Sequence, residues 1–179
     1  MKKLITILAI AIAVPSFVKA QGTINFGTAT ANHVIQQNSV SVGAGVATVG
    51  LYWGAQGSSA ESLVLLGTTQ TLNFGAINGG TLLTGAATAP GGVGTFEVRA
   101  WTGGFASYEL ALSSGVVGIA TGRSGVFNNA TGNPNPPTPT VPANLIGWTT
   151  PVALIVPEPS TIALGILGAG SLLFLRRKK

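Results

Sequence analysis

The sequence predicts a mostly β protein: an antiparallel sandwich of two sheets, of jelly-roll or immunoglobulin-like topology, with one short helix. Three observations lead to this prediction. Short segments rich in β-branched and aromatic residues recur along the chain, glycine-rich turns separate them, and helical character is confined to one short segment and the two ends. A β-helix is the alternative for a glycine-rich chain, although no period of 20 to 50 residues recurs.

The clearest predicted strand covers 94–102, because its alternate residues divide into an apolar and a more polar set. One face carries Phe96, Val98 and Ala100, and the other carries Glu97, Arg99 and Trp101. We expect this segment to be a central antiparallel strand. The other predicted strands are 23–26, 46–53, 63–66, 71–74, 81–83, 116–121, 124–127 and 145–156, the last kinked at Pro151.

The segment 106–113 is predicted to be the short helix. Tyr108, Ala111 and Leu112 fall at helical spacing, Ser107 can cap the start, and Gly115 follows where a helix would end. The segment 133–142 contains repeated prolines, which cannot donate to a ladder, so it is expected to form an extended loop.

Charge is concentrated at the two ends of the chain. The net charge is +5, but residues 21–157 hold only Glu61, Glu97 and Glu109 against Arg99 and Arg123, which gives one net negative charge. Nucleic-acid binding requires clustered cations that neutralise phosphates. The body therefore has no electrostatic surface for nucleic acid, and the basic pI of about 10.1 belongs to the ends.

The first twenty residues have the pattern of a secretory signal peptide. Lys2 and Lys3 precede an apolar run from Leu4 to Val14, and small residues stand three and one positions before a cut between Ala20 and Gln21. Signal peptidase is the expected partner. A retained N-terminal anchor is the alternative, although Pro15 interrupts the helix before the cleavage region.

The last residues form a rigid elbow, an apolar run and a basic end. Pro157-Glu158-Pro159 precedes the uncharged run Thr161 to Leu175, which as a helix would be about 23 Å long and could just span a bilayer. Cations after such a run stay on the cytoplasmic side. The basic residues are Arg176, Arg177, Lys178 and Lys179. A transmembrane helix with the body on the far side is therefore predicted.

This ordered tail resembles the PEP-CTERM sorting signal of bacteria that make exopolysaccharide. The residues that carry the resemblance to its motif are Val156, Pro157, Glu158, Pro159 and Ser160, followed by the apolar run and the basic end. The resemblance implies an inner-membrane-anchored precursor, which an exosortase-type membrane transpeptidase cuts near the elbow and passes to the cell surface or extracellular matrix. A plain C-terminal anchor is the alternative. The expected division is a leader at 1–20, a secreted body at 21–155 and a sorting segment at 156–179.

Few residues are available for catalysis, so we expect no enzyme, no cofactor and no metal site. The chain has no Cys, its acidic residues are all Glu, and His33 is its one histidine, which excludes the usual triads. Glu97 and Glu109 are the one pair that could hydrolyse a glycosidic bond. The alternative is that Glu97 pairs with Arg99 or a neighbouring strand and Glu109 lies on a solvated helix face. His33 is expected to be an ordinary surface or hydrogen-bonded histidine.

Aromatic residues offer one binding hypothesis. Trp101, Tyr52 and Trp53 could stack on sugar rings, or they could simply fill the core. The expected function is a structural or adhesive role at the cell surface or matrix, associated with exopolysaccharide. The alternative is a carbohydrate-binding module, with exopolysaccharide as its candidate ligand.

Overall fold

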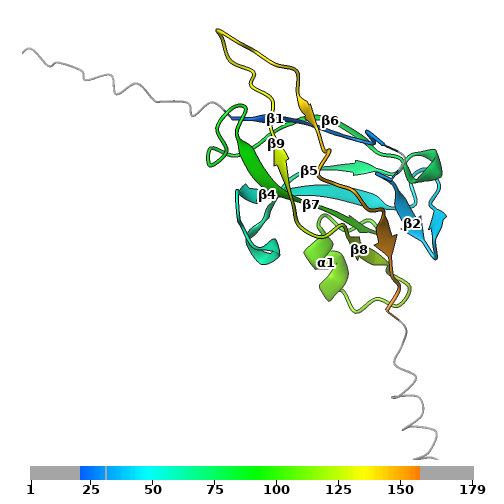
Figure 1. The fold of residues 1–179 in the computed structure, drawn as a ribbon. Helices are drawn as coiled ribbons and strands as arrows, with labels where there is room; N and C mark the ends of the chain where they lie inside the picture. Colours follow the sequence, from blue (N-terminus) through cyan, green and yellow to red (C-terminus); the bar gives the residue numbers. More distant parts are fainter. Residues whose placement is uncertain (1–20, 31, 158–179) are drawn as a thin grey trace, which may run out of the picture.

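The computed structural model describes residues 21–30 and 32–157. Within these residues the chain is mostly β, with three sheets, the short helix α1 (Tyr108–Ser113) and two 3₁₀ turns, η1 (Ala60–Ser62) and η2 (Asn73–Gly75) (Figure 1). The mostly β class with one short helix is confirmed. The predicted signal and transmembrane helices lie outside the described residues.

The largest sheet is antiparallel and is built around β7 (Val93–Trp101). Along one edge β7 pairs over eight residues with β4 (Thr48–Ala55), which in turn pairs with β5 (Val64–Gln70). The other edge of β7 is shared by β8 (Thr121–Arg123) and β9 (Phe127–Ala130). The prediction that 94–102 is a central antiparallel strand is therefore confirmed.

Two smaller sheets each contain a parallel pair. In one, β1 (Thr23–Gly27) lies between β6 (Asn78–Leu83), antiparallel, and β10 (Ala143–Asn144), parallel. In the other, β2 (Ile35–Gln37) lies between β3 (Val40–Ser41), antiparallel, and β11 (Val152–Leu154), parallel. The expectation of purely antiparallel sheets is wrong here, because β10 and β11 return from a distant part of the chain, and a long connection does not impose the hairpin direction.

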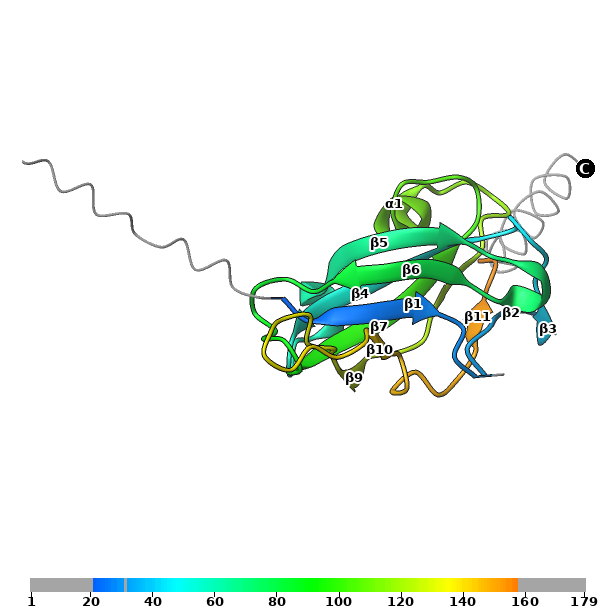
Figure 2. The same cartoon turned by 90° about the horizontal axis from the view of Figure 1, so that it is seen from above.

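The core lies between the β1 sheet and one face of the large sheet. Phe96, Val98 and Ala100 of β7 are fully buried in one cluster with Ile24 and Phe26 of β1. Figure 2 shows β1 and β6 lying over β4 and β7. The two-residue alternation of β7 thus directs its apolar set into the core and its polar set to the opposite face.

Helix α1 covers part of that opposite face. Ser107 accepts a hydrogen bond from the Leu110 N–H, as predicted for its cap. Tyr108 and Ala111 pack with Trp101 in a second, smaller apolar cluster. The helix therefore encloses side chains that the large sheet would otherwise expose.

The segment 71–74, predicted to be a strand, makes one isolated β-bridge at Thr71 and then enters the turn η2. Phe74 has a φ of +63° and is 82% exposed, while the Gly75 N–H donates to the Val42 carbonyl. Gly75 has a φ of +68°, and a Cβ there would lie 2.2 Å from the Ile35 carbonyl oxygen. The short apolar run marks a turn because the chain crosses here from the large sheet to β6 and must pass close to β2.

Three later strand predictions are displaced or shortened. Gly115 and Gly118 have φ values of +63° and +89°, so a loop occupies 116–119 and the strand β8 begins at Thr121. Residues 124–126 form an irregular connection with no regular secondary structure, and β9 begins at Phe127. The predicted strand 145–156 is interrupted by a turn in which the Trp148 N–H donates to the Leu145 carbonyl, so the strand proper is β11.

Candidate functional site

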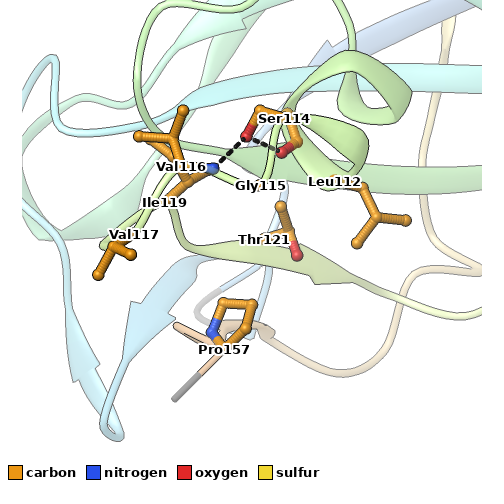
Figure 3. Close-up of a pocket in the computed structure, with 9 residues that line it drawn as sticks. Leu112, Ser114, Gly115, Val116, Val117, Ile119, Thr121 and Pro157 are labelled. Atoms are coloured by element: carbon orange, nitrogen blue, oxygen red, sulfur yellow. Dashed lines mark hydrogen bonds between the residues drawn. The ribbon is translucent and has the colours of Figure 1, made fainter. Parts of the chain in front are cut away.

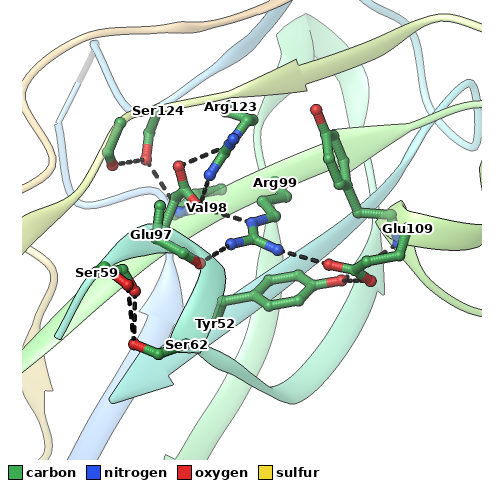
Figure 4. A network of polar contacts seen from close by, with 12 residues as sticks. Tyr52, Ser59, Ser62, Glu97, Val98, Arg99, Glu109, Arg123 and Ser124 are labelled. Atoms are coloured by element: carbon green, nitrogen blue, oxygen red, sulfur yellow. Dashed lines mark hydrogen bonds and ion pairs between the residues drawn. The ribbon is translucent and has the colours of Figure 1, made fainter. Parts of the chain in front are cut away.

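The charged side chains of the described body gather on the outer face of the large sheet. Strand β7 places Glu97 and Arg99 there, β8 contributes Arg123, and α1 contributes Glu109 (Figure 4). The η1 turn adds Glu61, which lines the same groove. Glu97 and Arg99 share a face because they are two residues apart on one strand. Residues distant in sequence thus form one polar site.

Glu97 is at the centre of a buried ionic network. Its Oε2 accepts a hydrogen bond from Arg99 Nε at 2.6 Å, and its Oε1 accepts one from Arg123 Nε at 2.9 Å. Glu97 is 1% exposed and Arg99 is 5% exposed. Burial of an unpaired charge costs several kcal/mol, so both arginines compensate the Glu97 carboxylate. The predicted pairing of Glu97 with Arg99 or a neighbouring strand is confirmed on both counts.

The remaining nitrogens of the Arg99 guanidinium connect the large sheet to α1 and η1. Nη1 donates to Glu109 Oε1 of α1, and Nη2 donates to the Ala60 carbonyl of η1. The guanidinium carbon lies 4.0 Å from the centroid of the Tyr52 ring, a cation–π contact. The Tyr52 hydroxyl donates to Glu109 Oε2 at 2.9 Å and accepts from the Tyr108 N–H at 3.2 Å.

This environment shifts three ionisation equilibria. Burial, reinforced by the hydrogen bond to Glu109, raises the pKa of Tyr52 to about 12. Burial alone would raise the pKa of Glu109, but hydrogen bonds from backbone N–H, Tyr52 and Ser107 and the charge of Arg99 outweigh it, so that pKa lies below its ordinary value. The hydrogen bond to Glu97 raises the pKa of Arg123. Glu109 and Arg123 therefore stay charged at neutral pH, and the Tyr52 hydroxyl stays protonated.

A groove of about 500 Å³ lies above the network. Its lining residues are Tyr52, Glu61, Leu63, Val64, Leu65, Arg99, Tyr108, Glu109, Leu112 and Arg123. The side chains of Glu109 and Arg123 are 54% and 38% exposed, so they offer an acceptor and a donor to a polar ligand. Glu109 is thus ion-paired as well as solvated, whereas the sequence predicted solvation alone.

The two carboxylates of the hypothetical glycosidase pair are both bound to Arg99. Glu97 is enclosed and paired with two arginines, so it does not face the groove as a free nucleophile. The lowered pKa of Glu109 keeps it deprotonated at neutral pH, the opposite of what a general acid requires. The geometry therefore favours the ion-pair interpretation.

The three candidate sugar-stacking residues lie in the interior. Trp101 is 0% exposed, Tyr52 is 2% and Trp53 is 8%. Trp101 Nε1 donates to the Phe105 carbonyl on the outer side of the sheet, whereas Trp53 belongs to the main core and donates to Thr88 Oγ1. Trp101 and Tyr52 belong to the outer cluster and Trp53 to the main core, so the three form no common platform, and their burial favours the packing alternative.

His33 is a buried, hydrogen-bonded histidine. It is 2% exposed, its ring stacks on Trp148 with centroids 4.8 Å apart, and its Nδ1 accepts from the Ala29 N–H at 3.3 Å. Burial lowers its pKa, and a backbone hydrogen bond to Trp148 partly opposes the shift. The alternative of a surface histidine is therefore wrong.

The chain leaves the fold beside α1 and β8. After β11, Ile155 exchanges two backbone hydrogen bonds with Thr121, of 3.0 and 2.9 Å. Pro157 then lines a small hollow of about 270 Å³ beside the loop that joins α1 to β8 (Figure 3). Of the residues predicted for signal cleavage and sorting, Gln21, Val156 and Pro157 are described. Those outside the described residues are Ala20, Glu158, Pro159, Ser160, Arg176, Arg177, Lys178 and Lys179.

Comparison with known proteins identifies this end of the chain. A family model described as the PEP-CTERM protein-sorting motif matches residues 156–179. The chain therefore carries a PEP-CTERM sorting signal, the mark of an exported protein that is membrane-anchored through this signal and targeted by an exosortase-type enzyme. The resemblance inferred from the sequence is confirmed. Neither the curated proteins nor the solved structures gave a match to the chain.

Within 21–30 and 32–157, no helix has the length and apolarity needed to cross a membrane. In the same part of the chain, no group of three or more His, Asp or Glu side chains is placed to hold a metal ion.

Proposed function

We propose that this chain is the precursor of a structural or adhesive protein of the cell surface or extracellular matrix, associated with exopolysaccharide. Signal peptidase removes residues 1–20, and an exosortase-type enzyme cuts near Pro157. The observation that carries the proposal is the sorting motif at 156–179, which begins where the folded body ends.

The geometry of the chain exit supports processing at this point. Among the described residues, the last one with a paired backbone is Ile155, and Pro157, two residues later, is exposed. A cut at the elbow would leave every described strand intact. The mature body would then be a compact domain. We propose that this domain has the topology of a β-sandwich.

The use of the charged residues supports the proposal of a non-enzymatic role. Four of the five charged side chains of 21–157 form one ionic network that joins β7, β8 and α1. Groups that stabilise one another are poorly suited to proton transfer, because each is already bound in one protonation state. We therefore propose that the network stabilises the domain.

Replacement of Pro157, Glu158 and Pro159 by Ala tests the sorting step. In the producing bacterium the altered chain should accumulate as an unprocessed membrane form, whereas the wild type should give a shorter product that begins at Gln21. Intact mass of both forms is the measurement. Pro134→Ala with Pro139→Ala, in an exposed loop, is the matched control and should be processed normally. Normal release of the elbow variant would contradict the proposal.

A second candidate function is carbohydrate binding in the polar groove. The observation that favours it is the partial exposure of Arg123 and Glu109, which could hydrogen-bond to sugar hydroxyls. Glu61→Ala combined with Leu112→Ala alters the rim without touching the ionic network. Co-sedimentation with the host's exopolysaccharide should fall about tenfold for a binding module. An unchanged result, equal to that of the exposed control Gln70→Ala, would support the structural role alone.

A further inference from the structure

We propose that an apolar surface beside the chain exit contacts the lipid bilayer while the precursor is anchored. This exit surface consists of Leu112, Val116, Val117 and Pro157, around the small hollow shown in Figure 3. The proposal rests on the proposed function, because it requires the run Thr161–Leu175 to be inserted in the membrane. It adds a second lipid contact, made by the folded body.

The exit surface is exposed and uncharged. Val117 is 80% exposed, Leu112 is 58% and Val116 is 55%. The hollow is lined by Ala111, Leu112, Ser114, Gly115, Val116, Val117, Ile119, Thr121 and Pro157, none of them charged. Contact with lipid would therefore bury apolar side chains without desolvating a charge.

Some polar backbone groups of the exposed loop between α1 and β8 already have hydrogen-bond partners within the protein. The Val116 N–H donates to Ser114 Oγ, which itself donates to the Ala111 carbonyl, and the Ile119 N–H donates to the Val116 carbonyl. A loop can approach the membrane interface at lower cost when its polar backbone groups have partners within the protein. The side chains of Val116 and Val117 can then contact lipid.

Chain length places this surface near the membrane. Within the part of the chain that the structure describes, Ile155 is the last residue held by backbone pairing, and the apolar run begins at Thr161, six residues later. Even fully extended, six residues reach about 20 Å. Since Pro157 itself lines the hollow, the surface around it is the part of the body from which the tether starts. A neutral, apolar surface in that position fits the headgroup and acyl boundary.

The chain has no cysteine, so a single introduced cysteine reports on one position. Val117→Cys is the test variant, and Val141→Cys is the matched control, because the two valines are 80% and 82% exposed. Val141 belongs to the 133–142 loop, drawn in yellow at the end of the body opposite the chain exit in Figure 1. Neither change removes a buried side chain, so both variants should fold.

Each full chain is expressed with its leader in cells without exosortase, purified in the leader-free form and labelled with an environment-sensitive fluorophore. It is reconstituted into vesicles of phosphatidylethanolamine and phosphatidylglycerol, about three to one. Flotation first tests anchoring. Quenching by aqueous iodide and by a nitroxide-bearing lipid then tests the position of each probe.

We expect both variants to float, with iodide quenching at position 117 reduced about fivefold or more and lipid-nitroxide quenching present, while position 141 stays open to iodide. Equal iodide quenching at both positions, or no nitroxide quenching at 117, would overturn the lipid contact but leave the anchored precursor intact. Protection of position 117 that appears only when exosortase is added would assign the surface to a protein partner instead. Failure to float would overturn both the contact and the anchoring it rests on.

Discussion

Arg99 donates from its Nε to the carboxylate of Glu97, two residues earlier on the same strand, at 2.6 Å. Both side chains are almost fully enclosed, and the same guanidinium also reaches Glu109 and the Ala60 carbonyl. One arginine therefore holds the sheet, the helix α1 and the η1 turn together. Its loss should affect all three elements.

Arg99→Met should destabilise the protein by about 3 kcal/mol, because it leaves the buried Glu97 with Arg123 as its remaining cation. Denaturant unfolding gives the free energy of unfolding. Glu61→Gln, at an exposed position, is the control and should stay within about 0.5 kcal/mol of wild type. The double variant Glu97→Gln, Arg99→Met should recover part of the loss. Equal stability of Arg99→Met and wild type would refute the bridging role.

Trp101→Ala should cost about 3–5 kcal/mol, the range for truncating a fully buried tryptophan. Trp101→Phe should cost less, because much of the apolar volume remains. Thermal unfolding of both variants is the measurement. If Trp101→Ala instead keeps its stability and loses retention of exopolysaccharide, the residue acts in binding and the packing interpretation fails.

His33 should make stability depend on pH below neutrality. Its pKa is lowered by burial, so below about 6.5 the unfolded state binds more protons than the folded state, and stability falls as the pH falls. The slope for one group is at most about 1.4 kcal/mol per pH unit. Unfolding measured between pH 7 and pH 5 should show this slope in wild type and lack it in His33→Gln. An unchanged slope in the variant would assign the pH dependence to another group.

Gly122→Ala should loosen the segment that leads to the sorting signal. A Cβ at Gly122 would lie 2.3 Å from the Ala153 carbonyl oxygen, so β8 and β11 must move apart. Hydrogen exchange of the Thr121 and Ile155 amides, which are bonded to each other's carbonyls, should accelerate at least about tenfold. Gly43→Ala is the control, since the nearest atom to its Cβ would be 3.7 Å away. Unchanged protection would show that the strands adapt without separating.

Local patterns in the sequence predicted the elements that local forces determine. The alternation in 94–102 and the Ser107 cap correctly predicted β7 and α1, because side-chain period and capping act within a few residues. The prediction failed at 71–74, where a short apolar run is a turn. Its conformation depends on contact between Gly75 and the distant Ile35. No local pattern contains that contact.

The candidate site was partly predictable in the same sense. The pairing of Glu97 with Arg99 followed from their shared strand face, but the participation of Arg123, Glu109 and Tyr52 did not. The scarcity of charge in 21–157 was the one available signal, because so few charges must compensate one another if they are buried.

The sequence by itself determined the sorting signal of this protein and its mostly β class, because an ordered linear motif and a two-residue period are both written in consecutive residues. The tertiary structure alone decided that Trp101 and His33 are buried, that β10 and β11 pair in parallel, and that four scattered charged residues form one ionic network. The physical reason is that burial, pairing direction and charge compensation depend on which distant segments pack together.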